Sequence, residues 1–167
     1  MLSHQEFYSV VKSTPLVAVD FLIFDNESKN ILLGKRLNNP AKDSFFSFGN
    51  AVFKNETLSQ SMNRVLVNEL NLQNVENYLK NAEFNGIFEQ FYENNFLDNS
   101  ATTHYVVISY ALKINKLDLQ NNKGNDAYTN QHENIKWFEL SKINNLPDVH
   151  EYVKTMNVIH YMHDKYY

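Results

Sequence analysis

Residues 49–72 of the chain read GNAVFKNETLSQSMNRVLVNELNL, a polar loop that leads into an amphipathic helix pattern. A helix over residues 57–70 would place four side chains on one stripe, at i, i+4, i+7 and i+11: Leu58, Met62, Val65 and Glu69. Glu69 therefore points where the apolar side chains point. A carboxylate is rarely buried without a partner, because removing its charge from water is costly. We expect a cationic partner for Glu69, which is either an arginine or a metal ion.

The composition is that of one globular domain spanning residues 1–167. The net charge of −4 provides no electrostatic attraction for DNA or RNA, so we expect no nucleic-acid partner. The absence of cysteine excludes disulfides and thiolate metal sites. No apolar run approaches the roughly 18 residues of a membrane span, and the N-terminus carries no basic-then-apolar signal. The sequence thus predicts a cytoplasmic protein with no membrane partner.

The hydrophobic pattern along the chain predicts an α/β protein. Helix signals fall on residues 3–12, 57–70 and 75–80, and from a cap at residues 147–151 to about residue 164. Strand signals fall on residues 16–24, 31–36, 45–48, 83–93, 102–114 and 135–140, with a polar loop at residues 123–126. This order of elements implies a mixed sheet with helices on both faces.

Residues 50–72 resemble the Nudix box, whose pattern is Gly, five residues, Glu, seven residues, then Arg-Glu-apolar-X-Glu-Glu-X-Gly-apolar. The positions that match the box are Glu56, Arg64, Glu69 and Leu72. The positions that depart from it are Asn50 and Asn71, which replace glycines, and Val65 and Asn68, which replace glutamates. The resemblance implies a Nudix-type α/β/α sandwich with a mixed β-sheet.

Further segments resemble one branch of that family, the GDP-mannose mannosyl hydrolases. These segments occur in the order found in those hydrolases, at residues 13–17, 20–21, 32–36, 91–96, 102–107 and 131–132. In that branch, water attacks the anomeric carbon of the sugar with inversion and gives GDP and the free sugar. The resemblance therefore implies a nucleotide-sugar substrate of the GDP-mannose type, and the match at the N-terminal helix implies a homodimer.

The same resemblance implies a metal site and a general base. The side chains of Glu69 and Gln131, with the main-chain carbonyl of Gly49, would bind one Mg²⁺, with Mn²⁺ as the alternative ion. All three donors are hard oxygen atoms of the kind that Mg²⁺ prefers. His132 would be the general base, a role that suits histidine as a residue type. The helical part of the box has one carboxylate instead of three, which argues against the multi-metal water activation of ordinary Nudix pyrophosphatases.

The resemblance also assigns residues to the substrate. Asp20 and Arg36 would line the sugar-diphosphate site and take part in catalysis, and Tyr105 would contact the diphosphate or the sugar. An arginine can hold phosphate oxygens through two parallel hydrogen bonds, which a lysine cannot. Tyr8 joins the substrate-binding residues as a ring that can stack on a base, with helix packing as its alternative role.

Structural roles are the alternatives for several of these residues. Glu69 would instead form an ion pair with Arg64 or another arginine. His132 would be an exposed histidine in a polar loop, and Asp20 would satisfy backbone groups or an arginine. For Glu56 and Arg64 we expect a scaffolding role, in which Arg64 holds the box loop through Glu56.

Two positions depart from the mannosyl hydrolases. Ala51 stands where they have an arginine that supports the departing GDP, so Lys54 or Lys35 would have to substitute for it. Gln90 stands where they have a histidine. Two other functions therefore stay open. One is a relative that processes GDP- or other nucleotide sugars with altered substrate or chemistry in surface-polysaccharide biosynthesis, and the other is a nucleotide-sugar binder without catalysis.

Overall fold

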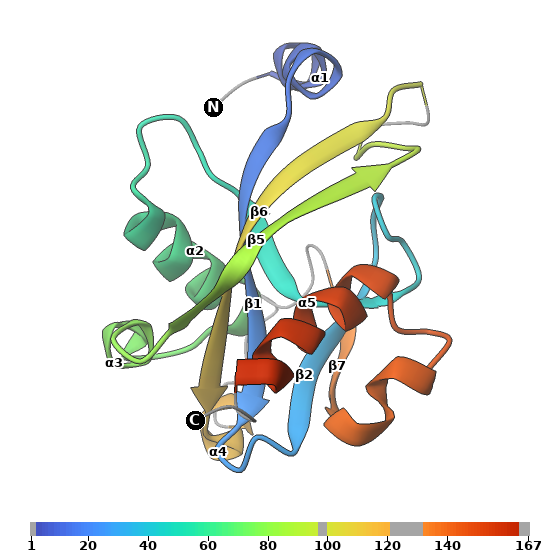
Figure 1. Ribbon diagram of the computed structural model, residues 1–167. Coiled ribbons are helices and arrows are strands. Elements are labelled where there is room, and N and C mark those ends of the chain that lie inside the picture. The colour runs from blue at the N-terminus through green and yellow to red at the C-terminus, as the bar shows by residue number, and fades with distance from the viewer. Residues whose placement is uncertain (1–2, 97–99, 121–131, 164–167) are drawn as a thin grey trace.

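The computed structural model describes residues 3–96, 100–120 and 132–163 (Figure 1). Gln131 and the predicted loop at residues 123–126 lie outside these ranges. The helices are α1 (His4–Ser13), α2 (Leu58–Leu70), α3 (Val75–Leu79), α4 (Lys116–Gln120), the 3-10 helix η2 (Leu140–Asn145) and α5 (Glu151–His163). The strands are β1 (Leu16–Asp25), β2 (Asn30–Arg36), β3 (Phe45–Phe46), β4 (Phe48–Ala51), β5 (Glu83–Tyr92), β6 (Thr103–Ile114) and β7 (His132–Glu139).

The strands form one mixed sheet, as the sequence predicts. The main order is β3-β2-β1-β6-β5, and in addition β4 pairs with β1 and β7 pairs with β2. Strands β1 and β6 are parallel and in register from Leu16–Tyr105 to Asp25–Ile114. Strands β2 and β4 pair with β1 in the antiparallel sense. The central position of β1 explains why its sequence is apolar on both faces.

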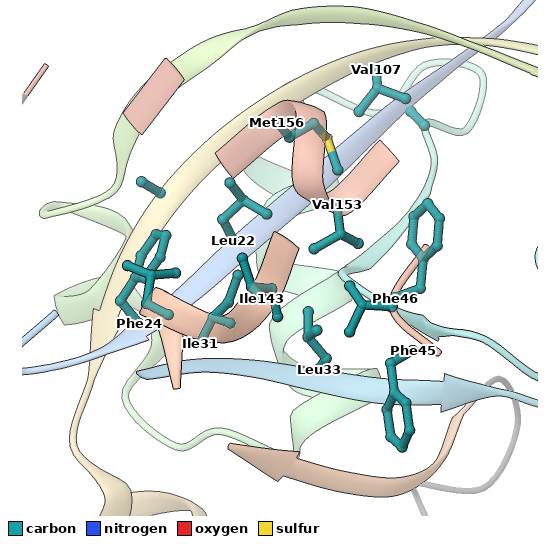
Figure 2. Close-up of a cluster of buried hydrophobic side chains, with 14 residues drawn as sticks. Leu22, Phe24, Ile31, Leu33, Phe45, Phe46, Val107, Ile143, Val153 and Met156 are labelled. Carbon is teal, nitrogen blue, oxygen red and sulfur yellow. The ribbon is translucent and has the colours of Figure 1, made fainter. Parts of the chain in front are cut away.

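Helices cover both faces of this sheet. Successive residues of β1 point to opposite faces. On one face, Leu22 belongs to the buried cluster that contains Val153 of α5 (Figure 2). On the other face, Phe21 belongs to the buried cluster that contains Leu66 and Leu70 of α2. The predicted α/β/α sandwich is therefore confirmed.

Helix α2 carries the buried glutamate and has a well-defined beginning and end. Oγ1 of Thr57 accepts a hydrogen bond from the backbone N–H of Gln60 at 3.2 Å, and the Gln60 side chain accepts from the backbone N–H of Thr57 at 2.8 Å. At its C-terminal end Asn71 adopts φ 50°, in the left-handed region. Asparagine tolerates this conformation better than most residues, so Asn71 makes the turn for which the box uses glycine. Glu69 is buried, as predicted, whereas Leu58 at the first turn is exposed.

The structure adds or corrects some elements. Helices α4 and η2 were not predicted. Strand β4 continues to Ala51, where the sequence predicts a loop, because Ala51 pairs with Ala18 of β1. Strand β7 begins at His132 and not at Ile135, because its pairing with β2 extends to Arg36–His132. In the described part of the chain, no helix has both the length and the hydropathy needed to cross a membrane.

Candidate active site

Asp20 and Gly49 lie against each other at the centre of the candidate site. They are partners in the antiparallel pairing of β1 with β4. A Cβ atom built on Gly49 would lie 1.8 Å from Oδ1 of Asp20, so a side chain has no room at this position. The carboxylate of Asp20 therefore packs against the backbone of β4. The structure thus brings together a residue predicted to act in catalysis and a residue predicted to bind the metal.

The surroundings of Asp20 shift its acidity toward neutral pH. The side chain is 6% exposed, and Oγ of Ser47 donates a hydrogen bond to Oδ2 at 3.1 Å. Burial raises the pKa of Asp20 to about 7, because the charged form loses its hydration. The hydrogen bond from Ser47 lowers this pKa, the charge of Glu69 raises it, and the charge of Arg36 lowers it. Asp20 can therefore exchange a proton near neutrality.

A cavity of about 590 Å³ adjoins Asp20 and falls within the usual size of small-ligand sites. Its polar lining comprises Asp20, Arg36, Asn38, Asn39, Ser47, Asn50 and Gln90, and its aromatic lining comprises Phe7, Phe46, Tyr92, Phe96 and Tyr105. Three predicted substrate residues, Asp20, Arg36 and Tyr105, thus share one cavity. Burial raises the pKa of Tyr105, so its hydroxyl remains a hydrogen-bond donor at neutral pH.

Tyr8 lies apart from this cavity lining. Its neighbour Phe7 lines the cavity instead, and the hydroxyl of Tyr8 forms a hydrogen bond with Oγ of Ser100 at 2.7 Å. The Phe7 ring also contacts Phe96 edge-on, with the ring centroids 6.4 Å apart. The structure therefore does not bring Tyr8 together with Asp20, Arg36 and Tyr105.

Glu69 and His132 form a buried pair beside Asp20. Nε2 of His132 lies 3.5 Å from Oε2 of Glu69, and both side chains are less than a tenth exposed. The alternative in which His132 is an exposed histidine in a loop is wrong, because His132 is buried, is the first residue of β7 and pairs with Arg36. The ring of Phe48 packs against the imidazole, with the ring centroids 5.0 Å apart. Neither residue is part of the cavity lining among the described residues.

The Glu69 carboxylate could provide oxygen ligands to an ion such as Mg²⁺. Both carboxylate oxygens of Glu69 are buried and accept no hydrogen bond from the described residues. A carboxylate that stays charged when buried in this way is stabilised by a nearby cation. In the described part of the chain, no cluster of three or more His, Cys, Asp or Glu side chains could hold a metal. Of the predicted ligands, only Glu69 belongs to these residue types. Gln131 lies outside the described residues.

Arg36 is the only cationic side chain in the cavity lining among the described residues. It lies at the end of β2, where its backbone N–H donates to the carbonyl of Ser44 at 2.9 Å. Nζ of Lys35 lies 3.7 Å from Oε1 of Glu133, and neither Lys35 nor Lys54 belongs to the described lining. The structure therefore offers no lysine of the described chain in place of the arginine that is missing at Ala51.

Arg64 connects helix α2 to the loop that precedes it. Its Nε donates to Oε1 of Glu56 at 2.7 Å, and its Nη2 donates to Oε2 of Glu56 at 2.8 Å and to the carbonyl of Ala51 at 2.9 Å. The guanidinium also lies 3.9 Å from the centroid of the Phe53 ring. The predicted scaffolding role is confirmed, and the alternative in which Arg64 pairs with Glu69 is wrong.

We expect Arg64→Ala to destabilise the fold by about 3 kcal/mol, because it removes the hydrogen bonds that Arg64 donates to Glu56 and to the Ala51 carbonyl. Arg64 is the main reason why the pKa of Glu56 falls from 4.5 to about 2. The stabilisation is therefore complete above pH 4.5 and disappears as the pH falls toward 2. Urea titrations at several pH values measure this effect. The exposed Lys54→Ala is the control, and equal stability of both variants would contradict the prediction.

Ser47 is a site residue that sequence reasoning missed. It is fully buried, lines the cavity, and donates to Asp20. Ser47 is the one polar residue within the aromatic run at residues 45–48, and this position could have identified it from the sequence. A hydroxyl in such a run needs a partner, and Asp20 is that partner because β1 and β4 are neighbours in the sheet.

These features define an α/β/α sandwich protein with a small-ligand cavity and a buried box carboxylate that accepts no hydrogen bond from the described residues. The chain belongs to the NUDIX family, because the model of the NUDIX domain matches residues 14–157. It is similar to the low-salt glycan biosynthesis protein Agl8 of Haloferax volcanii. The two chains are 32% identical over 135 residues, which represent 80% of this chain and 77% of that protein.

Solved structures share the fold. A NUDIX hydrolase from Nitrosomonas europaea superposes with a TM-score of 0.64 at 16% identity, over 89% of this chain and 90% of that chain. The NUDIX domain of Shewanella oneidensis NrtR, in a cocrystal with ADP ribose, superposes with a TM-score of 0.58 at 17% identity, over 93% and 95% of the two chains. At such identities the likeness shows the fold alone. The predicted Nudix-type fold is confirmed.

Proposed function

We propose that this protein is a Mg²⁺-dependent hydrolase of a GDP-sugar of the GDP-mannose type. Water would attack the anomeric carbon with inversion and release GDP and the free sugar. The observation that carries the proposal is the buried Glu69 carboxylate without a hydrogen-bond donor among the described residues, 3.5 Å from His132 and beside a cavity that holds Asp20 and Arg36. Membership of the NUDIX family supports hydrolysis of a nucleotide-linked substrate.

Each residue has a distinct task in this proposal. Glu69, Gln131 and the carbonyl of Gly49 would hold Mg²⁺, or Mn²⁺ in its place, and the ion would neutralise the diphosphate as it departs. Arg36 would hold phosphate oxygens from the cavity wall, where it is the cationic residue of the described lining. Tyr105 would donate a hydrogen bond from its protonated hydroxyl.

Two buried acid–base groups serve the attacking water. His132 is the proposed general base, in keeping with its position next to Glu69. Asp20 is the carboxylate that reaches the cavity directly, so it would contact the sugar-diphosphate or the water from that side. We further propose a cytoplasmic homodimer that binds no nucleic acid and no membrane.

The second candidate is a relative that processes another nucleotide sugar in the synthesis of surface polysaccharide. The similarity to a glycan biosynthesis protein favours this setting. The cavity also differs from that of the mannosyl hydrolases at Asn50, Ala51 and Gln90, and all three line it. Gln90 is buried and accepts a hydrogen bond from the hydroxyl of Tyr92 at 2.9 Å. This bond holds the Gln90 side chain in the wall of the cavity.

Product analysis tests the proposed reaction. The protein is incubated with GDP-mannose and Mg²⁺, and the products are followed by chromatography and by proton NMR of the sugar anomers. We expect GDP and free mannose, with the inverted anomer formed first. Formation of GMP and mannose 1-phosphate would contradict attack at carbon. A preference for another sugar in a panel of GDP- and dTDP-sugars would favour the second candidate, and a raised Tm without turnover would identify a binder without catalysis.

We expect His132→Gln to lower kcat by about 10²-fold, at the lower end of general-base contributions. The imidazole is buried beside Glu69 and outside the described cavity lining, so KM should change little. Steady-state kinetics with GDP-mannose measures both constants. His104→Gln is the matched control, since His104 stacks on Phe91 away from the cavity. An unchanged kcat in His132→Gln would remove this residue from the mechanism.

A further inference from the structure

Gly34 lies inside strand β2, where a glycine is unfavourable. Glycine in a strand loses more conformational freedom on folding than alanine does and offers no side chain for packing. The backbone at Gly34 has no positive φ, so the conformational freedom of glycine does not explain its presence. Another constraint must therefore exclude a side chain at this position.

The constraint is the imidazole of His132. A Cβ atom built on Gly34 would lie 2.7 Å from Cβ and from Nδ1 of His132, and 2.8 Å from Cγ. These separations are shorter than real Cβ atoms show, and the contacted atoms belong to the root and ring of a buried side chain. Relief would require displacement of the start of β7. The space at Gly34 is thus occupied by His132.

Packing and not hydrogen bonding orients this imidazole. No described residue forms a hydrogen bond with Nδ1 or Nε2 of His132. The ring contacts Gly34 and Phe48, and its Nε2 is 3.5 Å from Oε2 of Glu69. The pairing of β2 with β7 also shifts register between Leu33 and Lys35, directly at Gly34. The backbone of β2 is therefore irregular at Gly34, the residue that lies against the imidazole of His132.

We propose that Gly34 is a positioning residue. Because it has no side chain, it leaves a space that the His132 imidazole fills, here called the seat, and this space holds Nε2 of His132 close to Glu69. A methyl group at position 34 displaces the ring and breaks the approach of Nε2 to Glu69. The effect of this displacement on turnover rests on the proposed function, whereas the seat itself is a property of the fold and is tested without activity.

A cycle of thermal unfolding measurements tests the seat. Gly34→Ala should lower Tm by roughly 3–10 °C, because overpacking a buried site is destabilising. In a His132→Gly background the same substitution should leave Tm unchanged or raise it, because the clashing side chain is gone. If Gly34→Ala alone fails to fold, the double variant should fold again. An equal fall in Tm from Gly34→Ala in the wild type and in the His132→Gly background would overturn the proposal.

Two further readouts separate positioning from general structural damage. In the folded Gly34→Ala protein, the imidazole proton and nitrogen signals of His132 should shift, while those of His104 stay in place. With GDP-mannose and Mg²⁺, kcat should fall about 10-fold and KM should stay within about twofold, because the substitution leaves the cavity lining unaltered. Unchanged His132 signals would overturn the seat. A wild type without turnover would contradict the proposed function only.

Discussion

Replacing Glu69 with glutamine should reduce the turnover of GDP-mannose by about 10³-fold, because a bound metal ion supplies several kcal/mol of stabilisation to the departing charge. The carboxylate is 8% exposed and accepts no hydrogen bond from the described residues. Glutamine keeps the shape of the side chain and removes its charge, so the fold should be retained. Steady-state kinetics with Mg²⁺ gives the turnover, and Mn²⁺ titration followed by electron paramagnetic resonance gives the affinity, which should fall at least 10-fold.

The control for this experiment is Glu76→Gln, which makes the same change at an exposed position of α3. It should leave kinetics, metal affinity and Tm unaltered. A purely structural pair between Glu69 and His132 predicts a different result. In that case Glu69→Gln would lower Tm, because the 3.5 Å contact would lose its charge, while the affinity for Mn²⁺ would not change. That pattern would refute the metal site.

Local sequence signals predicted most elements of this fold. The apolar stripe was sufficient to predict α2, and the structure adds the capping residues Thr57 and Gln60 at its start. The two misplaced strand ends, at Ala51 and His132, have a common cause. Each is held in a strand by pairing with a residue distant in the sequence, Ala51 with Ala18 and His132 with Arg36. A short stretch of sequence contains no information on a pairing partner that lies far away in the chain.

The same distinction applies to the candidate site. The residue types of Asp20, Arg36 and Tyr105 and the resemblance predicted substrate contacts, and the cavity contains all three. The burial of His132, and the hydrogen bond from Ser47 to Asp20, depend on strand neighbours. A polar residue in an apolar segment signals that a partner exists, but only the topology identifies the partner.

Asp20→Asn should reduce turnover by about 10²–10⁴-fold and should also make the folded protein more stable at alkaline pH. Both effects have one cause, the buried carboxylate whose pKa burial raises to about 7. The catalytic loss follows from removing an ionisable group from the cavity wall. The gain in stability follows because asparagine carries no charge to bury. Steady-state kinetics and urea titrations between pH 5 and pH 9 measure the two effects.

The sign of the pH dependence follows from the raised pKa of Asp20. A group whose pKa is higher in the folded state favours folding at low pH, and this contribution disappears as the pH rises through about 7. Wild type should therefore lose stability relative to Asp20→Asn by on the order of 3–4 kcal/mol between pH 4 and pH 9.

The wild-type rate should rise with pH to a plateau above about 7, if the ionised form of Asp20 is the active one. Ser47→Ala removes the hydrogen bond that lowers this pKa, so it should move the rise to higher pH and keep its shape. Mg²⁺ should move the rise to lower pH, because a nearby cation favours the charged carboxylate. An unchanged rise in Asp20→Asn would assign the titration to another group. Because the Ser47→Ala substitution and the addition of Mg²⁺ shift the pKa of the same carboxylate in opposite directions, the two shifts together identify Asp20 more firmly than the loss of activity alone.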